Sequence, residues 1–119
     1  MKKTVILIMM LVGFIACDDI LEVENISSAA VVILAPANDV VIDTTAVTFT
    51  WEALEGAERY QLQIAKPTFE DAQQIVKDTT ITNTNVLVIL ENGDFQWRVK
   101  GINSAYQSKF TINSFTINE

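Results

Sequence analysis

The chain has 119 residues, half of them hydrophobic, which is enough for one domain with its own core. It has no histidine and one cysteine, so an imidazole ligand for a metal, a histidine-based triad, a near-neutral histidine base and an internal disulfide are all excluded. Its formal net charge of -7 also argues against nucleic acid as a partner.

The N-terminus has the pattern of a secretory signal peptide over residues 1–16. A basic start is followed by a 13-residue, largely apolar run at 4–16, which falls short of the roughly 20 residues of a membrane-spanning helix. The alternative is a buried core helix. The last residues, FIAC, resemble the lipobox of bacterial lipoproteins, with Phe14 where leucine is usual. The resemblance implies cleavage before Cys17 and a lipid anchor on its thiol, through which the protein would be attached to a membrane.

Residues 17–30 are predicted to be the lipidated cysteine and an acidic tether. The stretch 18–30 carries four acidic residues, no basic residue and no clean apolar period. Asp18 and Asp19 resemble both an inner-membrane retention signal and a cell-surface export signal, and the alternative is that they only solvate the linker. We expect a protein of the bacterial cell envelope, as an outer-membrane lipoprotein exposed at the cell surface. Removing Lys2 and Lys3 leaves 6 basic against 15 acidic residues, a net charge of -9.

Residues 31–119 are predicted to form an all-β domain of about seven short strands. Val31–Ala35 stops at Pro36, and Val40–Ile42 resumes extended structure at a sheet edge. Val47–Trp51 and Arg59–Ala65 then alternate apolar and polar residues with a period of two. Such alternation turns one face of each strand toward a core and the other toward water.

The pattern beyond Lys66-Pro67 is less regular. We predict a loop with at most one helical turn over Thr68–Gln74, an edge strand over Gln73–Lys77 and a link over Thr79–Val86. The apolar run Val86–Leu90 predicts a strand with much of both faces covered by neighbours.

A turn at Glu91–Asp94, in which Gly93 is free to take a positive φ, leads into a second central strand at Phe95–Lys100. In the last strand the apolar phase slips by one residue between Ile112 and Phe115. This slip predicts a β-bulge near Asn113-Ser114.

The run VTFTWEALEGAERYQLQIA, followed by LENGDFQWRVKGINSAYQS and a closing FTI, resembles the fibronectin type III-like modules of bacterial surface proteins over Val32–Ile117. The resemblance implies an immunoglobulin-like β-sandwich, which the number and spacing of the predicted strands also favour. It implies that Trp51 lies on the second strand, Tyr60 on the third and Phe95–Val99 on the sixth. Phe95 stands where the family usually has a tyrosine whose hydroxyl fixes the corner before the sixth strand. Packing or another hydrogen-bond donor must therefore hold this corner.

Seven side chains are predicted to form the core because they share the inward phase of their strands: Phe49, Trp51, Tyr60, Leu62, Phe95, Trp97 and Val99. For the large aromatic residues among them, Trp51, Tyr60 and Trp97, the alternative is a platform on which a sugar stacks.

The outward positions of the third and sixth strands carry basic and amide side chains: Arg59, Gln61, Gln63, Gln96, Arg98 and Lys100. The resemblance implies that these strands are neighbours in one sheet, and a basic face on an acidic domain then predicts recognition of an acidic glycan or of a partner's carboxylates. The alternative is a solvated face with cross-strand pairs. Tyr106, the aromatic residue in the polar loop Ile102–Ser108, is a further candidate for ligand binding, and its alternative is to fold back over the end of the sandwich.

No metal, cofactor or catalytic activity is expected. Glu52, Glu55, Glu58 and Asp94 supply oxygen ligands but lack the spacing of a known calcium loop, and no pair of carboxylates is marked as lying in a cleft. The sequence therefore predicts a non-catalytic, lipid-anchored module that binds a protein or glycan at the cell surface. The alternative is an accessory or spacer subunit of a larger outer-membrane complex.

Overall fold

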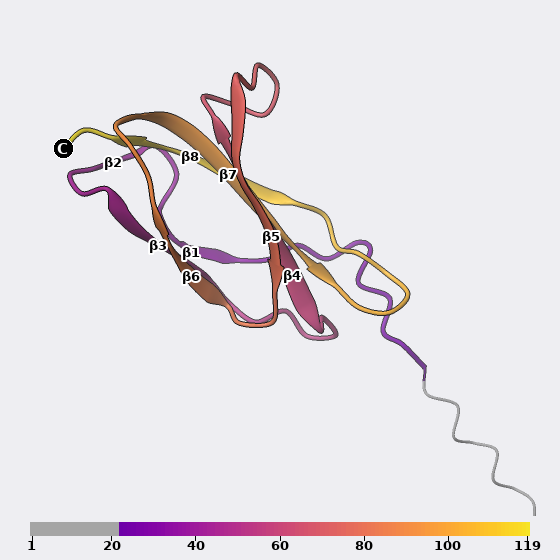
Figure 1. Cartoon of the computed structure of the whole chain (residues 1–119). Coiled ribbons are helices and arrows are strands. Elements are labelled where there is room, and N and C mark those ends of the chain that lie inside the picture. Colours follow the sequence, from indigo (N-terminus) through magenta and orange to yellow (C-terminus); the bar gives the residue numbers. More distant parts are fainter. Residues whose placement is uncertain (1–21) are drawn as a thin grey trace, which may run out of the picture.

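Two β-sheets packed face to face make up the part of the chain that the computed structural model describes, residues 22–119 (Figure 1). The strands are β1 (Ile33–Ala35), β2 (Val40–Ile42), β3 (Ala46–Trp51), β4 (Arg59–Lys66), β5 (Gln74–Ile81), β6 (Asn85–Ile89), β7 (Gly93–Ile102) and β8 (Thr111–Ile117). One sheet has the order β1-β3-β6 and the other β2-β8-β7-β4-β5, so the predicted β-sandwich is confirmed. The predicted signal peptide and Cys17 lie outside the described residues.

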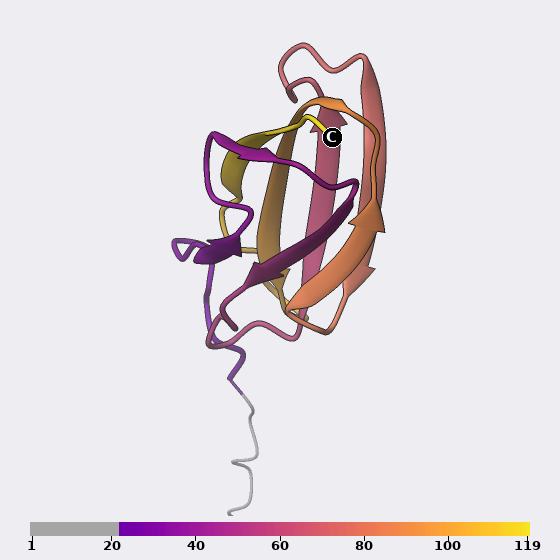
Figure 2. The ribbon, with the colours of Figure 1, turned by 90° about the vertical axis from the view of Figure 1, so that its left-hand side faces the viewer.

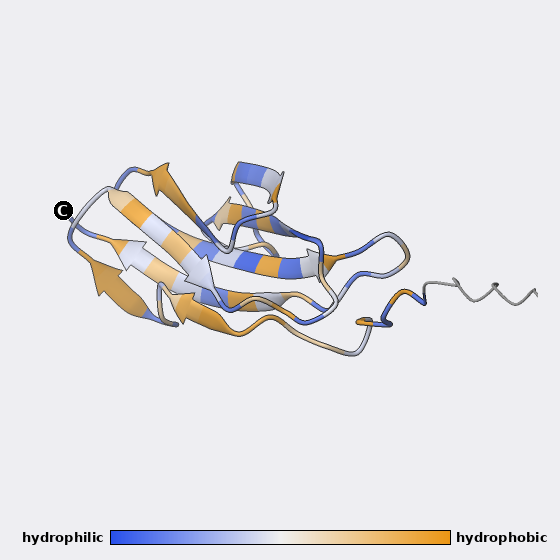
Figure 3. Cartoon of the chain, turned by 90° about the horizontal axis from the view of Figure 1, so that it is seen from below, coloured by the Kyte–Doolittle hydropathy of each residue, from blue (hydrophilic) through white to orange (hydrophobic). Residues whose placement is uncertain are grey.

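The core forms because β3, β4 and β7 alternate in phase. The colours of the longer strands in Figure 3 change from residue to residue, and the register pairs like with like, as in Leu62 opposite Val99. All seven predicted core residues are buried, with Trp51 and Trp97 only 1% and 0% exposed. The ring of Phe49 meets that of Trp97 edge to face at 4.8 Å. Burying a large apolar side chain stabilises the fold by about 1.5–3 kcal/mol, so this layer supplies much of the stability.

Pro36 divides the first extended segment between the two sheets. β1 pairs antiparallel with β3, whereas β2 pairs parallel with β8 and forms the edge of the five-stranded sheet (Figure 2). The edge position predicted for Val40–Ile42 is therefore confirmed. The described chain begins at one end of the sandwich and its C-terminus lies at the other.

Two predictions about the middle of the chain are wrong. β5 continues to Ile81, so the first residues of the predicted link are part of a strand. β6 is an edge strand rather than one covered on both faces, and its outward residues Leu87 and Ile89 are 60% and 67% exposed. Among the described residues, the three-stranded sheet buries only its inner face. The apolar run Val86–Leu90 therefore did not indicate that both faces of its strand are buried.

The bulge predicted near Asn113-Ser114 is also absent. β7 and β8 pair without interruption from Gly93 opposite Ile117 to Val99 opposite Thr111. The phase slip has a different cause, because Ile112 faces outward and Phe110, just before β8, contacts cationic side chains on the outer face of the sheet.

The second half of the predicted tether packs on the sandwich. Ile26 is 2% exposed, and the backbone N–H of Lys109 donates a 2.9 Å hydrogen bond to the carbonyl of Ala29. Gly56, with φ of 90°, lies so close that an added Cβ would meet Glu24 and Ile26 at 2.9 Å. We call residues 22–30 the strap, and they belong to the folded domain.

Aromatic packing holds the corner where Phe95 replaces the expected tyrosine. Its ring stacks on Phe115 with centroids 5.3 Å apart and an interplanar angle of 16°. A tyrosine hydroxyl does fix another connection, since Tyr60 Oη accepts a 2.9 Å hydrogen bond from Leu54 N. The described residues contain no helix with the length and hydrophobicity needed to span a bilayer.

Candidate functional site

The outer face of the five-stranded sheet brings together three of the four residues predicted to bind a ligand. β4 and β7 are adjacent, and their register sets Arg59 opposite Ile102, Gln61 opposite Lys100 and Gln63 opposite Arg98. Arg59, Arg98 and Lys100 therefore share the face that points away from the core, and we call this surface the cationic face.

Arg98 is held at the centre of the cationic face by two aromatic rings. Its Cζ lies 4.0 Å from the ring centroid of Phe69 and 4.3 Å from that of Phe110. Its Nε donates a 2.8 Å hydrogen bond to Oε1 of Gln63 on the neighbouring strand. Cation–π contacts of this kind contribute about 0.5–2 kcal/mol each, depending on desolvation.

Sequence reasoning missed both phenylalanines. Phe69 lies in the β4–β5 loop, which is held against β7 because its N–H donates a 2.8 Å hydrogen bond to Oε1 of Gln96. Phe110 carried one signal, since its apolar ring is out of phase with the buried Phe115 and Ile117. An aromatic residue at an outward position of a strand, where polar residues are usual, indicates that its ring has a partner on the surface of the sheet, such as an arginine on the neighbouring strand.

Lys100 is the second cation of the face. Its Nζ lies 4.7 Å from the ring centroid of Phe110, and it donates a hydrogen bond to Oε1 of Gln107 in the β7–β8 loop. Phe110 thus contacts both Arg98 and Lys100.

Asp78 on β5 is the acidic neighbour of the cationic face. Its carboxylate accepts hydrogen bonds from Nε2 of Gln61 at 2.9 Å and of Gln63 at 3.0 Å. These amide bonds, and after them the positive charges of Arg98 and Lys100, hold the pKa of Asp78 below its ordinary value, although partial desolvation opposes them. The single ion pair within 4 Å in residues 22–119 is Arg59 with Glu58, at 3.7 Å. Neither Arg98 nor Lys100 is therefore neutralised by direct contact.

The fourth candidate, Tyr106, lies at the end of the sandwich where the strap packs. Its loop is fixed by the buried Asn103, whose Oδ1 accepts hydrogen bonds from the N–H of Ala105 and of Tyr106 at 3.0 and 2.8 Å. Asn103 Nδ2 donates to the carbonyls of Glu24 and Gly56, at 2.9 Å each. Tyr106 itself is half-buried, and the structure links its loop to the cationic face through Gln107.

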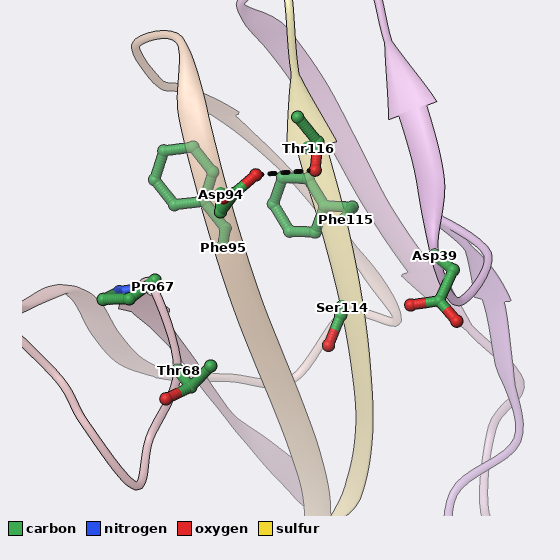
Figure 4. A pocket seen from close by; sticks show the side chains of 8 residues that line it. All are labelled: Asp39, Pro67, Thr68, Asp94, Phe95, Ser114, Phe115 and Thr116. Carbon is green, nitrogen blue, oxygen red and sulfur yellow. Dashed lines mark hydrogen bonds between the residues drawn. The ribbon is translucent and has the colours of Figure 1, made fainter.

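A shallow hollow of about 270 Å³ lies at the other end of the sandwich (Figure 4). Asp39, Asp94, Thr68, Ser114 and Thr116 supply its polar groups. Several of them already have partners, because Thr116 Oγ1 donates to Asp94 at 2.8 Å and Asp39 N donates to the carbonyl of Ser114 at 2.6 Å. The hollow offers two carboxylates and no basic group, which makes it a poorer receptor for an acidic partner than the cationic face.

The acidic residues weighed for calcium are not gathered at one place. Asp94 is the second residue of β7, whereas Glu58 N donates a hydrogen bond to the carbonyl of Ile102 at the far end of the same strand. Within the described part of the chain, no three potential metal ligands come together.

No protein-family model and no curated protein matches the sequence, but solved structures share its fold. The crystal structure of FN3tt has a TM-score of 0.55 at 12% identity and covers 75% of this chain and 94% of that one. The fibronectin(III)-like modules of Clostridium thermocellum CbhA give 0.55 at 12% identity, covering 74% and 95%. The fn3 domain of human collagen alpha-1(XX) gives 0.55 at 14% identity, covering 75% and 81%.

Proposed function

Since residues 22–119 have the fold of a fibronectin type III domain, we propose that the protein is a non-catalytic binding module anchored to the bacterial cell envelope through lipid on Cys17. Domains of this fold commonly act as binding or spacer modules, and a fold alone does not decide between these roles. The choice depends on the surface of this particular domain.

The observation that carries the proposal is the cationic face. After removal of the signal peptide the chain has 6 basic and 15 acidic residues, and three of the basic ones, Arg59, Arg98 and Lys100, lie on this one face. Clustered charge of the minority sign steers an oppositely charged partner to one orientation. The cationic face is therefore the surface that we propose to engage a protein or glycan partner at the cell surface.

The strap favours the cationic face over the Tyr106 loop. Glu24 is bonded to Asn103, so the chain leaves the domain beside this loop. The seven residue-to-residue steps from Cys17 to Glu24 span at most about 25 Å when fully extended. An anchor at Cys17 would then hold the Tyr106 end close to the membrane, while the cationic face, along the side of the sandwich, stays accessible.

The second candidate function is an accessory or spacer subunit of a larger outer-membrane complex. It is favoured by the bonds that the side chains of the cationic face make to one another, because Gln61, Gln63 and Asp78 form a network within the domain. Such a network also suits a face whose role is to stiffen the sheet.

Affinity capture from membranes tests the proposal. Full-length tagged protein is solubilised in mild detergent, and its co-purifying proteins and glycans are compared with those of Arg59→Glu/Lys100→Glu. A partner that is lost with the double variant supports binding through the cationic face. A stoichiometric protein that both forms retain supports the accessory role.

The anchor is tested separately. Cys17→Ser should remain an unprocessed precursor or leave the membrane fraction, with Cys17→Ala as a second variant. A mature N-terminus elsewhere, or wild-type protein in the soluble fraction, would contradict the anchor.

A further inference from the structure

We infer that Arg98 is the receptor for a carboxylate group of a protein partner, with Lys100 as a second, adjacent cation. The inference rests on the proposed binding function and names the chemistry of its partner. It is drawn from three features of the cationic face: a preorganised guanidinium, open hydrogen-bonding positions and a flat, partly aromatic surround.

Preorganisation is the first feature. An exposed arginine loses much rotamer freedom when it binds, which weakens the association. Arg98 has already lost that freedom, since the rings of Phe69 and Phe110 lie about 4 Å from its Cζ and Gln63 accepts from its Nε. A partner that binds here meets a guanidinium with its position already fixed.

Open positions are the second feature. Among the described residues, the hydrogen bond to Gln63 is the one that Arg98 makes through its side chain, so both terminal nitrogens keep their N–H groups. Two N–H groups in a planar fork match the two oxygens of a carboxylate, and such charge-assisted pairs are the strong ones. Lys100, over the same Phe110 ring, adds positive charge beside the fork.

Asp78 does not occupy the receptor. Its carboxylate is bonded to the amides of Gln61 and Gln63, and it makes no ion pair within 4 Å of either cation in the described chain. By accepting from Gln63 Nε2 it fixes the amide so that Oε1 faces Arg98. Asp78 therefore positions the receptor through Gln63.

The shape of the surround favours a protein over a free sugar. Sites for small molecules are usually concave, whereas three hollows in residues 22–119 are all lined by residues other than Arg98 and Lys100. The cationic face is a sheet surface with half-buried Phe69 and Phe110 and an exposed Ile112. Arginine and aromatic residues surrounded by apolar contacts are typical of protein interfaces.

The test is a titration of the full-length, ¹⁵N-labelled protein in nonionic detergent with hexaglutamate, followed by NMR. We expect saturable shifts of the Arg98 Nε–H signal and of the amides of Phe69 and Phe110, with none on adding hexaglutamine. This mapping needs no variant. Shifts confined to other basic residues, such as Lys66 or Lys109, would overturn the inference.

Variants then separate the fork from simple charge. Arg98→Lys keeps the charge and loses the fork, so binding of hexaglutamate should weaken about tenfold. Lys100→Gln should weaken it less and reduce its dependence on salt. Lys77→Gln is the matched control for Lys100→Gln, because Lys77 is exposed and lies opposite the buried Ile64, on the other face of the sheet, and it should change affinity less than about twofold. If Arg98→Lys binds hexaglutamate with wild-type affinity, only the charge matters, and the inference that the guanidinium of Arg98 receives a carboxylate is refuted.

A uronic acid oligosaccharide distinguishes the class of partner. If it binds Arg98 more tightly than hexaglutamate does, the partner is a glycan and the inference is wrong. A partner captured from membranes equally by wild type and Arg98→Lys would leave the proposed function standing and remove this site. If hexaglutamate binds at Arg98 but no partner is captured from membranes, the carboxylate site stands and the proposed function loses its support.

Discussion

Asn103 donates a 2.9 Å hydrogen bond from its side-chain amide to the backbone carbonyl of Glu24, which lies 79 residues earlier in the chain. The same amide nitrogen reaches Gly56, and its oxygen accepts from two N–H groups of its own loop. One buried side chain thus joins the strap, the β3–β4 loop and the β7–β8 loop.

Asn103→Ala should therefore cost more stability than its small change in volume suggests. It removes four hydrogen bonds and leaves two carbonyls and two N–H groups without their partner, and we expect a loss of about 2–4 kcal/mol. Urea unfolding followed by tryptophan fluorescence measures it. Asn118→Ala is the control, since that side chain is exposed and makes no hydrogen bond among the described residues. Equal midpoints for the two variants would contradict the role of Asn103.

The two tryptophans should report a dry core. Trp51 and Trp97 are buried, so their emission should be blue-shifted and acrylamide should quench it poorly. Trp97→Ala should destabilise the domain by about 3–5 kcal/mol, a large part of the 5–15 kcal/mol typical of a domain. Leu87→Ala, on the exposed face of β6, should change stability by no more than about 0.5 kcal/mol. Red-shifted, easily quenched emission from the folded protein would be inconsistent with this core.

Asp78 should make stability depend on pH below its ordinary pKa of 3.8. Its folded pKa is lowered, chiefly by the amides of Gln61 and Gln63, so its stabilising contribution is present above the unfolded pKa and is lost as pH falls through the folded value. The unfolding midpoint is measured at pH 5.5 and at pH 3, on either side of the ordinary aspartate pKa of about 4. Its drop between these two pH values should be smaller in Asp78→Asn than in wild type. Asp43→Asn, which removes an exposed carboxylate without a side-chain hydrogen bond among the described residues, should keep the wild-type drop.

The edge strand β6 should be the site at which the protein aggregates. Its sequence NVLVI has no charge and no proline, one side of the strand is unpaired in the described chain, and Leu87 is exposed. Leu87→Lys should slow aggregation on mild heating, measured by light scattering, without lowering the unfolding midpoint. Thr80→Lys, on the edge strand β5 of the other sheet, is the matched control and should have little effect. If Thr80→Lys slowed aggregation more than Leu87→Lys, the aggregation site would be β5 and the prediction would be wrong.

Prediction succeeded where the signal was local. Strict alternation placed Trp51, Tyr60 and Trp97 in the core without any knowledge of their partners. It failed for Leu87 and Ile89, because an apolar run does not say whether a second layer covers its strand. It also misread the phase slip of the last strand as a bulge, because the outward position of Phe110 depends on the arginine across the sheet.

The sequence by itself determined the class of fold, the inward face of the central strands and the outward position of Arg59, Arg98 and Lys100 on their own strands. These follow from the two-residue period of a strand, which is independent of the rest of the chain. Only the tertiary structure decided that Phe69 approaches Arg98, that Gln63 orients it and that the strap packs beside Asn103. Each of those contacts joins segments far apart in sequence, so it forms only once sheet pairing has brought β4, β7 and β8 side by side.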